Sequence, residues 1–286
     1  MHTGQRVAVL GMAVSAALAV AKITAGMAGH SNAVVSDGFE SVGDVFASGF
    51  VLLGLTLAAK PPDEDHPYGH GRIETLTGLL IGLVLTVAGV LISVASFEHL
   101  GQQHAAIQSF VMAPLIVSAL AKSGLATYKF RYARKLRSAS LTADAWNDSM
   151  DIVSALAALA AVALALADPI RFRDADRYGG IAVGLIVLFT GVRVVRDTAM
   201  QLIDTMPEPQ RMEEIRAAAA TVVGVRGVEK CFARKTGLRY HVDLHLEVDP
   251  DMTVRRSHEI AHNVRLRIKE KLDWVADVLV HVEPGR

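Results

Sequence analysis

Apolar residues along this chain are gathered into six long blocks separated by shorter polar stretches. Each block reaches the length of about 20 residues that an α-helix needs to cross a bilayer. The pattern therefore predicts six transmembrane helices, at residues 6–28, 33–59, 74–97, 107–128, 139–167 and 178–203. A content of 51% hydrophobic residues agrees with a polytopic membrane protein.

Beyond residue 206 the pattern changes to that of a small soluble domain. Strict alternation of apolar and polar residues predicts strands, and apolar residues at helical spacing predict helices. In chain order we expect a helix, two strands, a helix and a strand, at 209–220, 225–235, 240–249, 253–272 and 276–283. The order αββαβ predicts an open-faced, metallochaperone-like α/β sandwich. We therefore divide the chain into a transmembrane domain, 1–206, and a soluble domain, 207–286.

The buried stripe of the second helix in this domain is expected to consist of Val254, Ala261, Val264, Ile268 and Leu272. In the membrane part, small residues recur four apart, at Gly78 and Gly82 in the third block and Gly180 and Gly184 in the sixth. Such spacing is compatible with close contact between these two helices, although glycine is also common in membrane helices in general.

Basic residues set the expected orientation. Lysine and arginine are concentrated at 129–137, between the fourth and fifth blocks, whereas the first and third links carry none. The positive-inside rule places that link, both termini and the loop at 61–72 in the cytoplasm. We expect a multi-pass protein of the cell inner (plasma) membrane, whose soluble domain of about 80 residues is small enough to favour a homodimer.

Charge and cysteine content exclude other classes. The 29 basic and 29 acidic residues balance, so nothing indicates a nucleic-acid partner. The single cysteine, Cys231, excludes a disulfide framework and a zinc site built on cysteines.

Carboxylates interrupt two of the apolar blocks, where charges are costly and usually functional. The second and fifth blocks carry matching sets, Asp37, Glu40 and Asp44, and Asp144, Asn147 and Asp151. Residues three, four and seven apart share one face of a helix. Because the two helices run antiparallel in a six-span topology, two oxygen-bearing faces can meet inside the bundle.

These features together resemble the cation diffusion facilitator family, whose members are divalent metal cation/proton antiporters. The resemblance rests on six spans, an acid pair four apart in the second, a matching pair in the fifth, the loop DEDHPYGHGRIE at 63–74 and the αββαβ tail. It implies efflux of a divalent metal from the cytoplasm and a homodimer whose tail senses metal. It also implies that the first, second, fourth and fifth helices rock against the third and sixth.

By this resemblance the transport site consists of Glu40, Asp44, Asn147 and Asp151. Four oxygen donors on facing helices can replace the hydration shell of a dication. Zinc-transporting members usually have histidine where Asn147 stands and often where Glu40 stands. The harder all-oxygen set favours Mn²⁺ as cargo, with Zn²⁺ or Fe²⁺ as the alternatives. Metal and protons would compete for the carboxylates, which is a sufficient basis for antiport.

Further metal sites and an ion pair are implied by the same resemblance. A loop site would consist of Asp63, His66 and His70, and Arg72 would pair with Asp204 at the dimer surface. A regulatory cytosolic site, where metal would act as an effector, would consist of Glu229, His245, His258, His281 and Glu283. The alternative for the loop and tail residues is that they are solvated surface groups.

Two other functions fit parts of the sequence. Residues 258–262 read HEIAH, a literal H-E-x-x-H on a predicted helix, which is the signature of zinc metalloproteases. A membrane-anchored protease would, however, need a third ligand and a substrate cleft, for which a domain of about 80 residues has little room. A metal sensor that binds without transporting is the other alternative.

Glu259→Gln separates the protease from the exporter. Glu259 would be the general base of a protease, so the variant would abolish peptide cleavage, whereas an exporter should keep its metal flux. We expect the Glu259→Gln variant to export metal from proteoliposomes as fast as the unsubstituted chain, and neither of these two proteins to hydrolyse peptides. Loss of a peptidase activity present in the unsubstituted chain would contradict the exporter interpretation.

Overall fold

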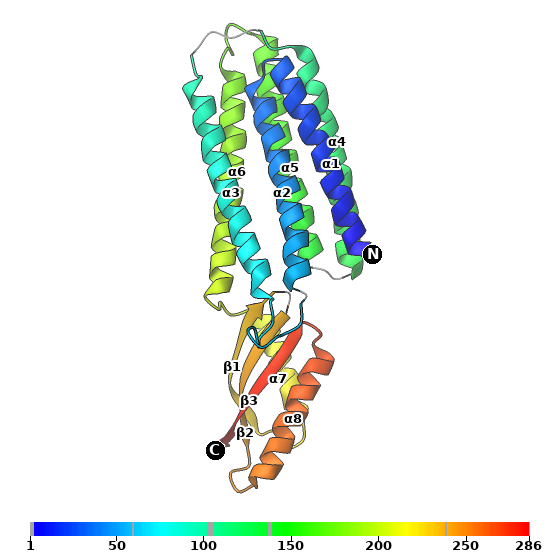
Figure 1. Cartoon of the computed structure of the whole chain (residues 1–286), viewed down its shortest axis with the longest axis vertical. Helices are drawn as coiled ribbons and strands as arrows, with labels where there is room; N and C mark the ends of the chain where they lie inside the picture. Colours follow the sequence, from blue (N-terminus) through cyan, green and yellow to red (C-terminus); the bar gives the residue numbers. More distant parts are fainter. Residues whose placement is uncertain (1–2, 59, 102–105, 137–138, 238, 286) are drawn as a thin grey trace. The chain divides into compact units, whose positions relative to one another are not determined.

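Six long helices form the first part of the chain (Figure 1). The computed structural model describes residues 3–58, 60–101, 106–136, 139–237 and 239–285. The helices are α1 (Thr3–Ala28), α2 (Asn32–Ala58), α3 (Arg72–Glu98), α4 (Met112–Leu136), α5 (Ala139–Ala167) and α6 (Ala175–Leu202). Five of them, all but α2, contain a described stretch long and apolar enough to span a membrane. The polytopic helical fold is thereby confirmed.

The chain folds into two compact units, one of residues 1–52 and 80–195 and the other of residues 53–79 and 196–286. The core of the first unit is built by small and branched apolar side chains of α2, α4, α5 and α6, including Val34, Leu115, Val162 and Val183. A short 3-10 turn, Ser109–Val111, precedes α4 and adds Val111 to this core.

Glycines bring α3 and α6 into backbone contact. A Cβ atom added to Gly89 would overlap the backbone of Leu188, and one added to Gly184 would overlap Ser93. Gly82 lies in the same way against Val195. The suspected contact between the third and sixth helices is therefore present, because only small residues let two helices approach so closely.

The start of α2 is fixed by a carboxylate from α6. Asp176 accepts hydrogen bonds from the Ser31 hydroxyl at 2.5 Å and from the backbone N–H of Asn32 at 2.6 Å. A negative charge at this point satisfies free N–H groups and complements the helix dipole. The interaction anchors the helix that carries the first set of acidic residues.

The tail of the second unit has the predicted order αββαβ. Its elements are α7 (Pro209–Ala220), β1 (Gly227–Thr236), β2 (Arg239–Val248), α8 (Val254–Lys271) and β3 (Val275–Pro284). The sheet has the strand order β1-β2-β3, with β1 antiparallel and β3 parallel to β2. Because β3 is parallel to its neighbour, the connection through α8 has to cross over the sheet.

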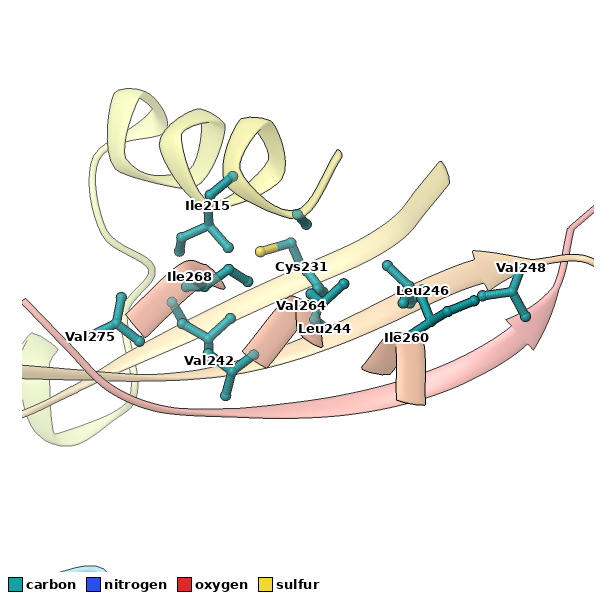
Figure 2. Packing of buried hydrophobic residues seen from close by; sticks show 14 residues of the cluster. Ile215, Cys231, Val242, Leu244, Leu246, Val248, Ile260, Val264, Ile268 and Val275 are labelled. Atoms are coloured by element: carbon teal, nitrogen blue, oxygen red, sulfur yellow. The ribbon is translucent and has the colours of Figure 1, made fainter. Parts of the chain in front are cut away.

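Both tail helices pack on one face of this sheet. The alternate residues Val242, Leu244, Leu246 and Val248 of β2 meet Ile215 of α7 and Ile260, Val264 and Ile268 of α8 (Figure 2). The expected stripe of α8 is wrong at Val254, which is 84% exposed. Val254 is the first residue of α8 and does not pack against the sheet. Ile260 belongs to the buried stripe instead.

Candidate functional site

Carboxylates of α2 and α5 converge on one lysine of α4. Lys122 Nζ lies 3.1 Å from Asp44 Oδ2 and 2.6 Å from Asp151 Oδ2. The Lys122 side chain is only 2% exposed. Two of the four residues predicted for the transport site are therefore held together, across two helices, by a single buried ammonium group.

A third carboxylate, Asp148 of α5, joins this cluster. Asp148 Oδ1 lies 3.4 Å from Lys122 Nζ, and Asp148 Oδ2 lies 2.6 Å from Lys129 Nζ. Both Asp148 and Lys129 are buried. The sequence placed Lys129 in the basic link after the fourth span, whereas α4 continues to Leu136 and buries this residue against α5.

Glu40 faces the same region from α2. Its carboxylate accepts a short hydrogen bond from the Ser154 hydroxyl of α5 and interacts electrostatically with Asp151 and Asp44. Glu40 also lines a mainly apolar cavity of about 530 Å³ between α2 and α3, together with Phe39 and Leu91. Glu40 therefore lies between the buried charge cluster around Lys122 and this cavity.

Asn147, the fourth predicted ligand, is placed differently. Its side chain is exposed, while the neighbouring Asp148 is buried in the cluster. Spacing alone could not separate the two, because positions three and four before Asp151 both lie on its side of a helix. The side chain of Asp144 lies outside the described residues.

Asp37 has a partner of its own. Its carboxylate lies 2.6 Å from Nζ of Lys22 in α1, and both side chains are almost completely buried. Two fully desolvated charges need each other in this environment. Asp37 is therefore held in an ion pair with α1 in this structure.

The burial of three lysines in the helical bundle was not predicted from the sequence. Lys22, Lys122 and Lys129 each lie within a long, mostly apolar helix and each binds a carboxylate there. The signal was present, since a lysine inside such a block is as costly as an aspartate. Lys122 and Lys129 are also seven apart, which places them on one face of α4.

The loop between α2 and α3 brings its three candidate ligands together. Asp63 lies 2.9 Å from His66 Nδ1 and 3.4 Å from His70 Nε2. The hydrogen bond with His66 lowers the pKa of Asp63 below its ordinary value. One ligand atom from each residue lies within 4.8 Å of the others, so the three could share one ion. Arg72 forms an exposed ion pair with Asp204 at 3.0 Å, within the same chain.

A second cluster lies on the face of the tail sheet away from the helices. His245 Nδ1 is 2.5 Å from Glu283 Oε1, and His281 Nε2 is 3.6 Å from the same oxygen. These three residues could share one ion. They meet because parallel pairing puts His245 opposite His281 and Glu247 opposite Glu283. The carboxyl group of Glu229 lies close enough to interact with Glu283.

His258 is placed elsewhere, exposed on α8, and so is His262 of the HEIAH sequence. Glu259 between them forms an exposed ion pair with Arg256 at 2.9 Å. The described metal-ligand clusters contain none of these three residues. In the part of the chain that the structure describes, His258, Glu259 and His262 thus lie on the exposed face of α8, while Ile260 of the same motif packs in the core.

Comparisons with known proteins cover nearly the whole chain. A family model described as the cation efflux transmembrane domain matches residues 8–203, and one described as the cation efflux protein cytoplasmic domain matches residues 207–285. The chain is 29% identical to the manganese efflux system protein MneP of Bacillus subtilis, over 98% of this chain and 96% of MneP.

Two further matches are less complete. The chain is 30% identical to metal tolerance protein C1 of Arabidopsis thaliana, over 99% of this chain and 63% of that protein. A solved structure of the MamM CTD is 32% identical, with a TM-score of 0.27, and covers 27% of this chain and 100% of its own.

The tail cluster makes stability depend on pH. The interaction with the Glu229 carboxyl group, followed by the hydrogen bond with His245, lowers the pKa of Glu283 below its ordinary value of 4.5. A depressed carboxylate pKa stabilises the fold above the ordinary value, and this contribution is lost as the pH falls through the lower, folded-state value. We expect His245→Ala to raise the Glu283 pKa in an NMR titration of the full chain, and His258→Ala to leave it unchanged. If the pKa of Glu283 were the same in the unsubstituted chain and in both variants, the contact between His245 and Glu283 would be contradicted.

Proposed function

This chain belongs to the cation diffusion facilitator family, and we propose that it exports Mn²⁺ from the cytoplasm in exchange for protons. The chain is a multi-pass membrane transporter for metal cations and not an enzyme. The specific metal, the proton coupling and the cytoplasmic position of both termini in the inner (plasma) membrane are our proposals.

The observation that carries the proposal is the convergence of Asp44 and Asp151 on one point inside the bundle. Both oxygens lie within 3.1 Å of the same nitrogen, although they come from different helices. Glu40 faces this region from the turn before Asp44, and we propose these three carboxylates as cargo ligands. Asn147 would complete the set only if its exposed side chain turned inward when metal binds.

The choice of metal follows from the donor atoms. Glu40, Asp44 and Asp151 offer only carboxylate oxygens, and hard oxygen donors suit Mn²⁺ better than Zn²⁺ or Fe²⁺. A relative that is similar over nearly its full length is named a manganese efflux protein. We therefore place Mn²⁺ ahead of Zn²⁺ and Fe²⁺ as cargo.

Charge balance supports the exchange of metal for protons. Among the described side chains of the cluster, carboxylates outnumber ammonium groups, with Glu40, Asp44, Asp148 and Asp151 against Lys122 and Lys129. With every group ionised, two negative charges remain. One dication or two protons would neutralise them, and an uncompensated charge is costly in a membrane. Alternate occupation by metal and by protons is the simplest cycle that keeps the site neutral.

The tail, residues 207–286, is proposed as a dimerising and metal-sensing domain. Phe232 and Leu279 are exposed and lie in register with Asp243 on the open face of the sheet, where they offer apolar surface to a second copy. The cluster of His245, His281 and Glu283 lies on the same face. Metal bound there would stabilise whichever arrangement of two tails it binds more tightly. The Asp63, His66 and His70 loop is proposed as a weaker site.

Asp151→Ala tests the transport site. Removing a carboxylate ligand should lower Mn²⁺ flux in proteoliposomes on the order of tenfold or more, and Glu259→Gln, on the exposed face of α8, serves as the matched control. In the unsubstituted protein an imposed pH gradient should drive the flux. Flux that ignores the gradient would contradict proton coupling, and much faster transport of Zn²⁺ than of Mn²⁺ would contradict the choice of metal.

Two histidine variants test the tail site. His281→Ala should abolish Zn²⁺ binding at the tail, measured by calorimetry on the full chain carrying Asp151→Ala, because it removes one of three clustered ligands. His258→Ala should bind as tightly as its parent, since His258 lies apart on α8. Equal loss in both variants would show that the ligand set includes His258 in the metal-bound form.

A further inference from the structure

Lys122 places a cation where the proposed cargo would bind. Its nitrogen lies between Asp44 and Asp151, both proposed ligands, at 3.1 and 2.6 Å. Lys122 is among the largest fully buried side chains of the chain, so these carboxylates replace the water shell of the ammonium. We propose that Lys122 is a tethered substitute for the cargo, which occupies the empty site and moves aside when metal binds. This inference rests on the proposed function, because it assumes that the metal uses the same carboxylates.

The structure offers the displaced ammonium a place to go. Asp148 Oδ1 is already 3.4 Å from Lys122 Nζ, while the other oxygen of Asp148 is bound to Lys129. Asp148 is outside the proposed ligand set. A dication between Asp44 and Asp151 would repel the ammonium more strongly than either carboxylate holds it, since its charge is twice as large. A small shift toward Asp148 would keep Lys122 paired.

This arrangement has two consequences for transport. A carrier must return after it releases its cargo, and every carboxylate of the site that protons leave ionised is costly in a low-dielectric bundle unless a positive charge pairs with it. Lys122 lowers that cost by keeping one positive charge in the site on the way back. The same charge competes with the metal, so it weakens binding. Lys122 should therefore speed the return of the empty carrier and lower the affinity for the metal.

Lys122→Met separates these effects, because exchange of Mn²⁺ for Mn²⁺ does not require the empty carrier to return, whereas net efflux does. In proteoliposomes we expect net Mn²⁺ efflux to fall about tenfold while Mn²⁺ exchange stays within about twofold. In detergent, Mn²⁺ affinity at the site that Asp151→Ala removes should rise about tenfold. Lys122→Arg keeps the charge and should retain more net efflux than Lys122→Met.

Lys22→Met is the matched control, since it removes another buried lysine that is paired with Asp37 instead. It should not separate net efflux from exchange. If Lys122→Met folds poorly, Lys122→Met with Asp148→Asn restores the charge balance and should show the same separation. A parallel fall of exchange and net efflux, or an unchanged affinity, would overturn the proposal. If the unsubstituted chain lacks Mn²⁺ binding that depends on Asp151, the proposed function fails first and this inference with it.

Discussion

The pairing of buried charges is the constraint on which the membrane part of this protein depends. Aspartates and lysines of α1, α2, α4 and α5 are almost completely withdrawn from water, and each is stable there only because an opposite charge lies within reach. Removing one partner of such a pair leaves a charge that a low-dielectric environment tolerates poorly. The positions of these helices are therefore linked to the charge state of the site.

The bundle uses a different kind of contact between α3 and α6. There the helices approach through glycines, so that Gly89 and Gly184 lie against the backbone or a short side chain of the neighbour. Such packing relies on shape and carries no charge. A dication or a proton entering the cluster would change the interactions among α2, α4 and α5 and leave this contact unaffected. In the proposed transport cycle, this difference would allow one group of helices to rock against the other.

The tail shows how strand pairing can build a metal-binding cluster. His245 and Glu283 come from strands that are far apart in the chain, and the parallel register of β2 and β3 brings them within hydrogen-bond distance. The apolar residues of β2 fix that register, because a slip by one residue would expose Val242 and Leu244 and turn His245 into the core. The same alternation thus supports both the core and the cluster.

The sequence by itself determined the six helices, the αββαβ order and most of the acidic residues of the buried cluster around Lys122. Hydrophobic period and helix spacing are local properties, and they are sufficient for these predictions. It also indicated that carboxylates of α2 and α5 face one another. Only the tertiary structure decided that Lys122 binds Asp44 and Asp151, that Asp148 and not Asn147 enters the cluster, and that His258 lies apart from His281. These outcomes depend on helix rotation and strand register, which are set by contacts between segments distant in the chain.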